Sequence, residues 1–115
     1  MNDIPQYNTL KVLERMCEEE KSCVASCAKY TEKLIKLCEK LAKHSLSTDA
    51  SSSLAEKRTI VNFALLLSFD PEAKTIILKL LPTLKHIQHM LQSNDNKLKE
   101  STVIFIHNVY NFGTS

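Results

Sequence analysis

The chain of 115 residues contains one glycine, three prolines and no tryptophan. Tight β-hairpin turns depend on glycine, so this scarcity argues against an all-β fold. It also disfavours the glycine-rich loop that cradles phosphates in nucleotide-binding sites. The longest apolar run, Phe63 to Leu67, is far too short to cross a bilayer. Together with an apolar content of 43%, these absences favour a soluble helical protein with one core.

The chain has no large excess of positive or negative charge. It contains 15 Lys and Arg residues and 13 Asp and Glu residues, and the resulting net charge of +2 is spread along the chain. Nucleic-acid binding leaves a concentrated basic footprint, so we expect no nucleic-acid partner. The N-terminal sequence MNDIPQYN has no basic, apolar and small-residue pattern of a signal peptide. We therefore expect an intracellular, cytoplasmic protein with no membrane partner.

The four cysteines, Cys17, Cys23, Cys27 and Cys38, all fall in the first third of the chain. Their spacing gives no paired C-x-x-C ligands, so we expect no metal or other cofactor. Helical periodicity explains them more simply, because a 4,3,4,3,4 spacing places small cysteines in one apolar seam. That seam comprises Cys23, Cys27, Tyr30, Leu34, Leu37 and Leu41. A disulfide, zinc or redox role for the cysteines is the less favoured alternative.

One segment of the chain recurs after 43 residues: Thr59 to Phe69 (TIVNFALLLSF) returns as Thr102 to Phe112 (TVIFIHNVYNF). The matched pairs are Thr59/Thr102, Ile60/Val103, Val61/Ile104, Leu66/Val109, Leu67/Tyr110 and Phe69/Phe112. Self-similarity of about 40 residues between helical segments is typical of stacked helical repeats. The sequence therefore predicts part of a solenoid, a class that presents binding surfaces far more often than catalytic sites.

Hydrophobic periodicity predicts six helices, at about 5–20, 22–44, 53–68, 71–81, 82–92 and 96–111. The helix at 53–68 is apolar nearly all round and must be packed between neighbours. Elsewhere one face of each helix is apolar. We expect the inward residues to include Leu10, Leu13, Met16, Cys17, Ile76, Ile77, Leu80, Leu84, Ile87, Met90, Leu91, Leu98, Thr102, Phe105, Ile106, Val109 and Phe112.

Short signals mark the helix ends. Ser53 and Glu56 form a capping box, and Asp70 precedes Pro71 as an N-cap before a first-turn proline. Pro82 lacks an amide hydrogen, so it should end one helix and begin the next. Gly113 should provide a left-handed C-cap for the last helix. The serine-rich stretch 45–53 should be a polar loop.

Residues 70–112 carry a short helix after Asp-Pro-Glu, a Pro-led helix, a Ser-Asn-Asp turn and a long helix with His-Asn-Val. This order resembles one armadillo repeat. The resemblance implies an all-α, armadillo-like right-handed helical repeat in one domain, 1–115. Residues 1–69 would form a diverged first repeat with the loop 45–53, and residues 70–112 a second repeat. The glycine usual before the proline of the second helix is replaced by leucine.

In armadillo proteins an asparagine of the third helix commonly holds the backbone of an extended partner peptide. The resemblance places that residue at Asn108, whereas Leu65 stands at the equivalent position one repeat earlier. Candidate binding residues on the same surface are Arg58, Asn62, Ser101, Asn108 and Tyr110. The implied function is a non-catalytic scaffold or adaptor module, part of a larger solenoid protein, that binds a helix or peptide of another protein or flanking repeats of its own chain.

Two alternatives come from the residues themselves. The seam from Cys23 to Leu41 could serve as a coiled-coil contact of a self-associating helical bundle, although it covers fewer than three heptads. His86 and His89 are three residues apart, as some metal ligands are, but the sequence fixes no third ligand. No catalytic triad or nucleotide-binding motif is present, so we expect no enzyme.

Overall fold

The computed structural model describes residues 4–46 and 53–110 of the chain. Within these residues every regular element is a helix, which confirms the all-α class, although there are seven α-helices rather than six. They are α1 (Ile4–Glu19), α2 (Lys21–Ala28), α3 (Thr31–Leu46), α4 (Ser53–Leu67), α5 (Pro71–Leu80), α6 (Lys85–His89) and α7 (Asn96–Tyr110). Two 3-10 turns, η1 (Leu81–Thr83) and η2 (Met90–Gln92), flank α6.

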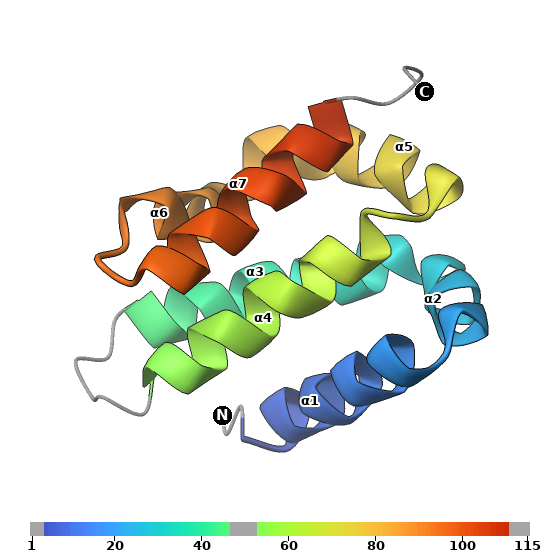
Figure 1. The fold of residues 1–115 in the computed structure, drawn as a ribbon, viewed down its shortest axis with the longest axis horizontal. Helices are drawn as coiled ribbons and strands as arrows, with labels where there is room; N and C mark the ends of the chain where they lie inside the picture. The colour runs from blue at the N-terminus through green and yellow to red at the C-terminus, as the bar shows by residue number, and fades with distance from the viewer. Residues whose placement is uncertain (1–3, 47–52, 111–115) are drawn as a thin grey trace.

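The helices form two layers (Figure 1). Helices α1, α4 and α7 lie side by side in the front layer and run in the same direction, while α3, α5 and α6 lie behind them. The central helix α4 contacts α1 on one side, α7 on the other and α3 behind. The expectation that this helix is packed between neighbours is confirmed.

Helix α4 owes its central place to an apolar circumference. Five of its side chains are fully buried, namely Ile60, Val61, Phe63, Ala64 and Leu67. The buried apolar residues of the other helices join them in one core that extends from Leu10 to Val109. Removing such side chains from water is the main source of stability in a small helical domain.

The start of α5 follows the predicted signal. The side chain of Asp70 accepts a hydrogen bond from the backbone N–H of Ala73, at 3.0 Å, and Pro71 occupies the first turn. This cap satisfies one of the amides that a helix start leaves without a partner. At the start of α4, Glu56 accepts a hydrogen bond from the Ser45 hydroxyl at 3.4 Å, so it links α4 to the end of α3.

The predicted single helix at 22–44 is wrong, because the chain breaks at Lys29 and Tyr30 into α2 and α3. At the start of α3 the Thr31 hydroxyl donates to the carbonyl of Ala28 at 2.6 Å. Tyr30 is 61% exposed, so the predicted seam does not run along one helix. The buried residues of α3 are Thr31, Ile35, Cys38, Leu41, Ala42 and Ser45, so the seam residue Leu41 is buried as expected, while Leu34 and Leu37 are half-buried and pack against the core.

Two further expectations need correction. The predicted helix at 82–92 is divided into η1, α6 and η2, because Leu84 leaves the helical region with φ −91° and ψ 53°. Met16 was expected to point inward but is 47% exposed. Phe112, Gly113 and most of the serine-rich loop lie outside the described residues. Leu84, Ile87 and Met90 are buried as predicted, as are Leu98, Thr102, Phe105 and Val109 of α7, whereas Ile76 and Leu91 are only half-buried.

Candidate interaction surfaces

The five predicted binding residues lie on α4 and α7, the centre and one edge of the front layer. Arg58 and Tyr110 are exposed, whereas Asn62, Ser101 and Asn108 are half-buried. Three of the five make polar contacts with neighbouring helices of the layer or with the turn before α7. Each contact joins two segments that are far apart in the sequence.

Arg58 on α4 makes a two-pronged ion pair with Asp95, which precedes α7. Its Nη2 donates to Asp95 Oδ1 at 2.6 Å and its Nε to Oδ2 at 3.2 Å. Asp95 Oδ2 also accepts from the backbone N–H of Leu98 at 2.8 Å. The hydrogen bond from Arg58, followed by that from Leu98, lowers the pKa of Asp95. A single carboxylate thus caps α7 and ties it to α4.

Asn62 joins α4 to α1 on the opposite side. Its amide Nδ2 donates to the carboxylates of Glu14, at 2.7 Å, and Glu18, at 2.8 Å. Burial raises the pKa of Glu14, while the hydrogen bond from Asn62 opposes that shift. The asparagine therefore offsets part of the cost of holding two carboxylates one helical turn apart.

Asn108 joins α7 back to the end of α4. Its Nδ2 donates to the hydroxyl of Ser68 at 3.1 Å, and that hydroxyl in turn donates to the carbonyl of Leu65. Its partner Ser68 is 40 residues away in the sequence. A peptide that bonded to the Asn108 amide would have to share it with Ser68 or replace that bond.

A second candidate surface is the side of α7 that faces solvent. Val103 is 50% exposed, Ile104 38% and Tyr110 67%, and His107 lies between them on the exposed side. Large apolar side chains this accessible on one helix mark contact surfaces more often than isolated ones do. The sequence analysis marked Tyr110 as a binding residue but missed the exposure of Val103 and Ile104.

A third candidate is a groove of about 750 Å³ where the end of α1 and helix α2 meet the corner between α4 and α5. Apolar side chains provide most of its wall, and Glu18, Lys21 and Asp70 lie among them. The apolar lining comprises Cys17, Val24, Ala25, Leu66, Phe69 and Pro71. Phe69 is 58% exposed here, so the groove offers an aromatic contact at its edge.

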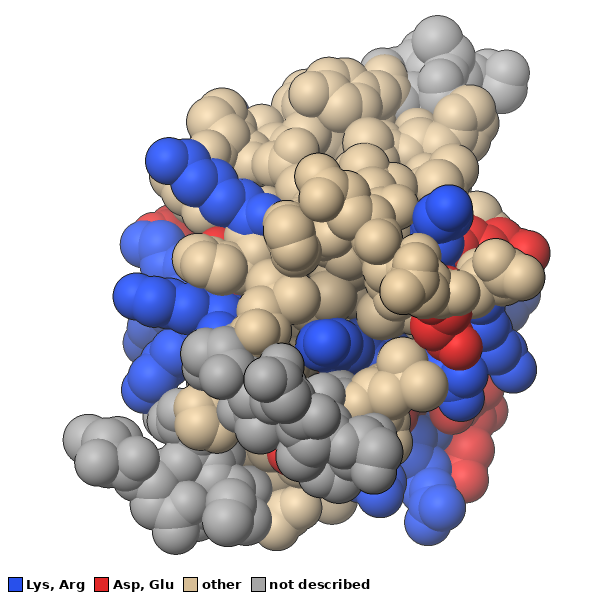
Figure 2. Space-filling model, turned by 90° about the vertical axis from the view of Figure 1, so that its left-hand side faces the viewer, with Lys and Arg blue, Asp and Glu red and all other residues tan. Residues whose placement is uncertain are grey.

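Charge is unevenly spread over the end of the molecule where α6 and the start of α7 lie. Figure 2 shows Lys, Arg, Asp and Glu along the flanks and the lower half of this face, and a largely uncharged area over its upper middle. Two hollows of about 400 and 480 Å³ share His89 and Gln92 in their walls. The hollows themselves are not free of charge, since Lys57 and Asp95 line the smaller one and Lys85 lines the larger one.

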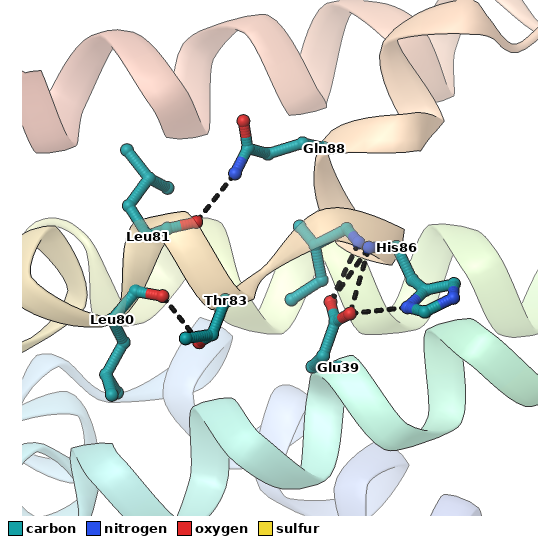
Figure 3. A network of polar contacts seen from close by, with 7 residues as sticks. Glu39, Leu80, Leu81, Thr83, His86 and Gln88 are labelled. Atoms are coloured by element: carbon teal, nitrogen blue, oxygen red, sulfur yellow. Dashed lines mark hydrogen bonds and ion pairs between the residues drawn. The ribbon is translucent and has the colours of Figure 1, made fainter.

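A polar network holds α6 against α3 (Figure 3). The carboxylate of Glu39 accepts hydrogen bonds from the backbone N–H groups of His86, at 2.9 and 3.1 Å, and Ile87, at 3.0 Å. The His86 ring nitrogen Nδ1 lies 2.5 Å from the same carboxylate. Nearby, Gln88 Nε2 donates to the carbonyl of Leu81 at 2.7 Å. The Glu39 carboxylate thus caps the start of the short helix α6, and we assign Glu39 and His86 a structural role.

No group of three or more His, Cys, Asp or Glu side chains in the described part of the chain could hold a metal ion. The cysteines are free thiols, and burial strongly raises the pKa of Cys38. None of the described helices combines the length and apolarity needed to cross a membrane.

Comparison of the chain with protein-family models, curated proteins and solved structures finds no significant match.

Proposed function

We propose that the chain is a non-catalytic helical-repeat module that binds a helix of another protein and serves as a scaffold or adaptor. It would act inside the cell, where a reducing environment suits four unpaired cysteines. The partner helix would lie on the exposed side of α7, beside the layer of α1, α4 and α7.

The observation that carries this proposal is a difference between equivalent positions of α4 and α7. Ile60 and Val61 are fully buried in α4, whereas Val103 and Ile104, 43 residues later, are 50% and 38% exposed. Helix α4 has a parallel neighbour on each side, but α7 has one only on the side of α4 (Figure 1). The outer side of α7 therefore carries apolar residues that suit coverage by one more helix.

The parallel course of α1, α4 and α7 supports a solenoid of the armadillo type, in which corresponding helices stack on one another. In such a module the edge helix can accept a repeat of the same polypeptide or a helix of a partner. A repeat and a partner helix would both contact the same apolar side chains of α7. The prediction that this surface is covered therefore holds for either of them.

Extended-peptide binding along Arg58, Asn62, Ser101 and Asn108 is a second mode of the same module. These residues lie on two neighbouring parallel helices. Arg58, Asn62 and Asn108, however, already bond to Asp95, to Glu14 and Glu18, and to Ser68. A peptide would gain only the difference between its own bonds and those it replaced, so we favour helix binding on α7.

Quantitative co-purification with the tagged natural protein tests the proposal. The double variant Val103→Asp/Ile104→Asp should lose bound protein at least about tenfold, since two carboxylates would have to be desolvated on docking. The control Val12→Asp/Met16→Asp places the same charges on α1, where the wild-type side chains are 59% and 47% exposed. Equal recovery of the same proteins by both variants would contradict a binding role for α7.

Self-association is the rival reading of the same apolar surface. Sedimentation velocity of the purified protein over a wide concentration range distinguishes the two. We expect a monomer whose sedimentation is unchanged by Val103→Asp/Ile104→Asp. A concentration-dependent dimer that this variant dissociates would replace the proposed adaptor with an oligomerisation module.

A further inference from the structure

Two of the four cysteines lie in direct contact. The Sγ atoms of Cys17, in the last full turn of α1, and Cys27, near the end of α2, are 3.7 Å apart. A disulfide requires about 2.05 Å, so the two sulfurs would have to approach by about 1.7 Å for the bond to form. The two helices are joined by a tight connection at Glu20, and only nine residues separate the cysteines in sequence.

The two sulfurs differ in their access to solvent. Cys17 is 4% exposed. Cys27 is half-buried and opens onto a surface groove of about 370 Å³. The groove is lined by Leu13, Met16, Cys23, Ser26, Cys27, Tyr30 and Leu34. A small oxidant can therefore reach Cys27 from this groove, whereas Cys17 is not part of its lining.

We propose that Cys17 and Cys27 are the site of a reversible disulfide, formed by exchange with a small-molecule disulfide of the glutathione type. The bond would join the end of α1 to α2. Cys17 also lines the groove of about 750 Å³ that Phe69 borders, so the modification alters the wall of a candidate contact surface. Cys38 takes no part, since it is fully buried in α3.

The exchange proceeds in two steps that balance. The thiolate of Cys27 attacks one sulfur of oxidised glutathione, which forms a mixed disulfide and releases one glutathione thiolate. Cys17 then loses its proton to that thiolate or to water and attacks the sulfur of Cys27, so that the second glutathione leaves. The protein gives up two electrons and two protons, and one oxidised glutathione becomes two reduced molecules.

The order of attack follows from the environments of the thiols. Burial, together with contact with Cys27, raises the pKa of Cys17 to about 12, so this sulfur is a poor first nucleophile. Once a mixed disulfide stands at Cys27, the adjacent Cys17 attacks intramolecularly, and proximity offsets its weak ionisation.

Peptide mapping tests the site directly. The purified protein is incubated with oxidised glutathione, quenched with acid, alkylated and digested with trypsin without reduction. Cleavage after Arg15, Lys21 and Lys29 places Cys17 in peptide 16–21 and Cys27 in peptide 22–29, together with Cys23. The Cys23→Ser variant removes that ambiguity. Peptide 37–40, which carries Cys38, is the internal control.

We expect peptides 16–21 and 22–29 to be linked in the wild type and in Cys23→Ser, and the intact monomer to be lighter by about 2 Da. The oxidised protein should melt about 5 to 10 °C higher, since a short loop is closed, and dithiothreitol should reverse both changes. A stable glutathione adduct without the link, a link that Cys23→Ser abolishes, or covalent dimers would each overturn the proposal.

Discussion

Helices α4 and α7 share a sequence pattern but occupy different environments. At equivalent positions Ile60, Val61 and Leu67 are fully buried, while Val103, Ile104 and Tyr110 are 50%, 38% and 67% exposed. The difference lies in the neighbours and not in the helices, because α4 has α1, α3 and α7 around it. A repeated apolar pattern therefore predicts which helix faces are suited to packing against another helix. Only the fold shows whether such a helix is present.

The largest difference in stability is expected when an aspartate is placed at equivalent positions of α4 and α7, one at a time. Val61→Asp should unfold the protein, because a buried carboxylate without a partner costs a large share of the 5 to 15 kcal/mol that stabilises a typical domain. Ile104→Asp should change the free energy of unfolding by less than about 1 kcal/mol. Thermal melts followed by circular dichroism measure both. Similar melting of the two variants would mean that the burial of α4 and α7 is wrongly described.

Truncation to alanine at a second pair of equivalent positions, Leu67 and Tyr110, should give a smaller difference in the free energy of unfolding. Leu67→Ala should cost about 2 to 5 kcal/mol, through lost burial and the cavity left behind. Tyr110→Ala removes a side chain that is 67% exposed and should cost less than about 1 kcal/mol. Urea unfolding at neutral pH provides the two values. A costly Tyr110→Ala would show that this ring packs against the protein in solution.

The contact between α4 and α7 can be weakened from either end. Asp95→Ala should lower the melting temperature more than Arg58→Ala, by about 3 to 6 °C against about 2 °C, because Asp95 also caps α7. The Asp95 pKa is lowered from its ordinary value of 3.8, so its stabilising contribution is present above pH 3.8 and is lost as the pH falls through its folded-state pKa. The difference in melting temperature between the wild type and Asp95→Ala should therefore begin to shrink as the pH falls below 3.8, and it should keep shrinking as the pH falls through the lowered folded-state pKa. A difference that stayed constant as the pH fell below 3.8 would point to another cause.

The smallest loss of stability is expected at the other end of the contact between α4 and α7. Asn108→Ala removes the hydrogen bond to Ser68 and should cost about 0.5 to 1 kcal/mol. A double-mutant cycle with Ser68→Ala isolates the pair, and we expect the two single costs to be less than additive. Strict additivity would show that the two side chains do not interact.

Periodicity predicted the inward faces well where burial is one-sided. Leu98, Thr102, Phe105 and Val109 are all buried in α7, and the Asp70 cap of α5 forms as expected. These features depend on neighbours in sequence, so local patterns are sufficient for them.

Features that depend on distant segments were not predicted. Lys29 and Tyr30 are neither glycine nor proline, so no local signal marked the break between α2 and α3. The partners of Arg58 and Asn108 lie 37 and 40 residues away, beyond any local pattern. The exposure of Val103 could have been suspected from the 43-residue repeat, since an edge helix keeps the apolar pattern of a central one.

Site-specific photo-crosslinking within the whole protein in cells tests the central claim, that the outer side of α7 accepts a helix. A photoreactive amino acid at position 103 should crosslink to a segment with apolar residues at 3,4 spacing, and Ile104→Asp should abolish the product. The same group at the exposed position Lys79 on α5 serves as the control. Crosslinking from position 103 that is no stronger than from position 79 would contradict the claim.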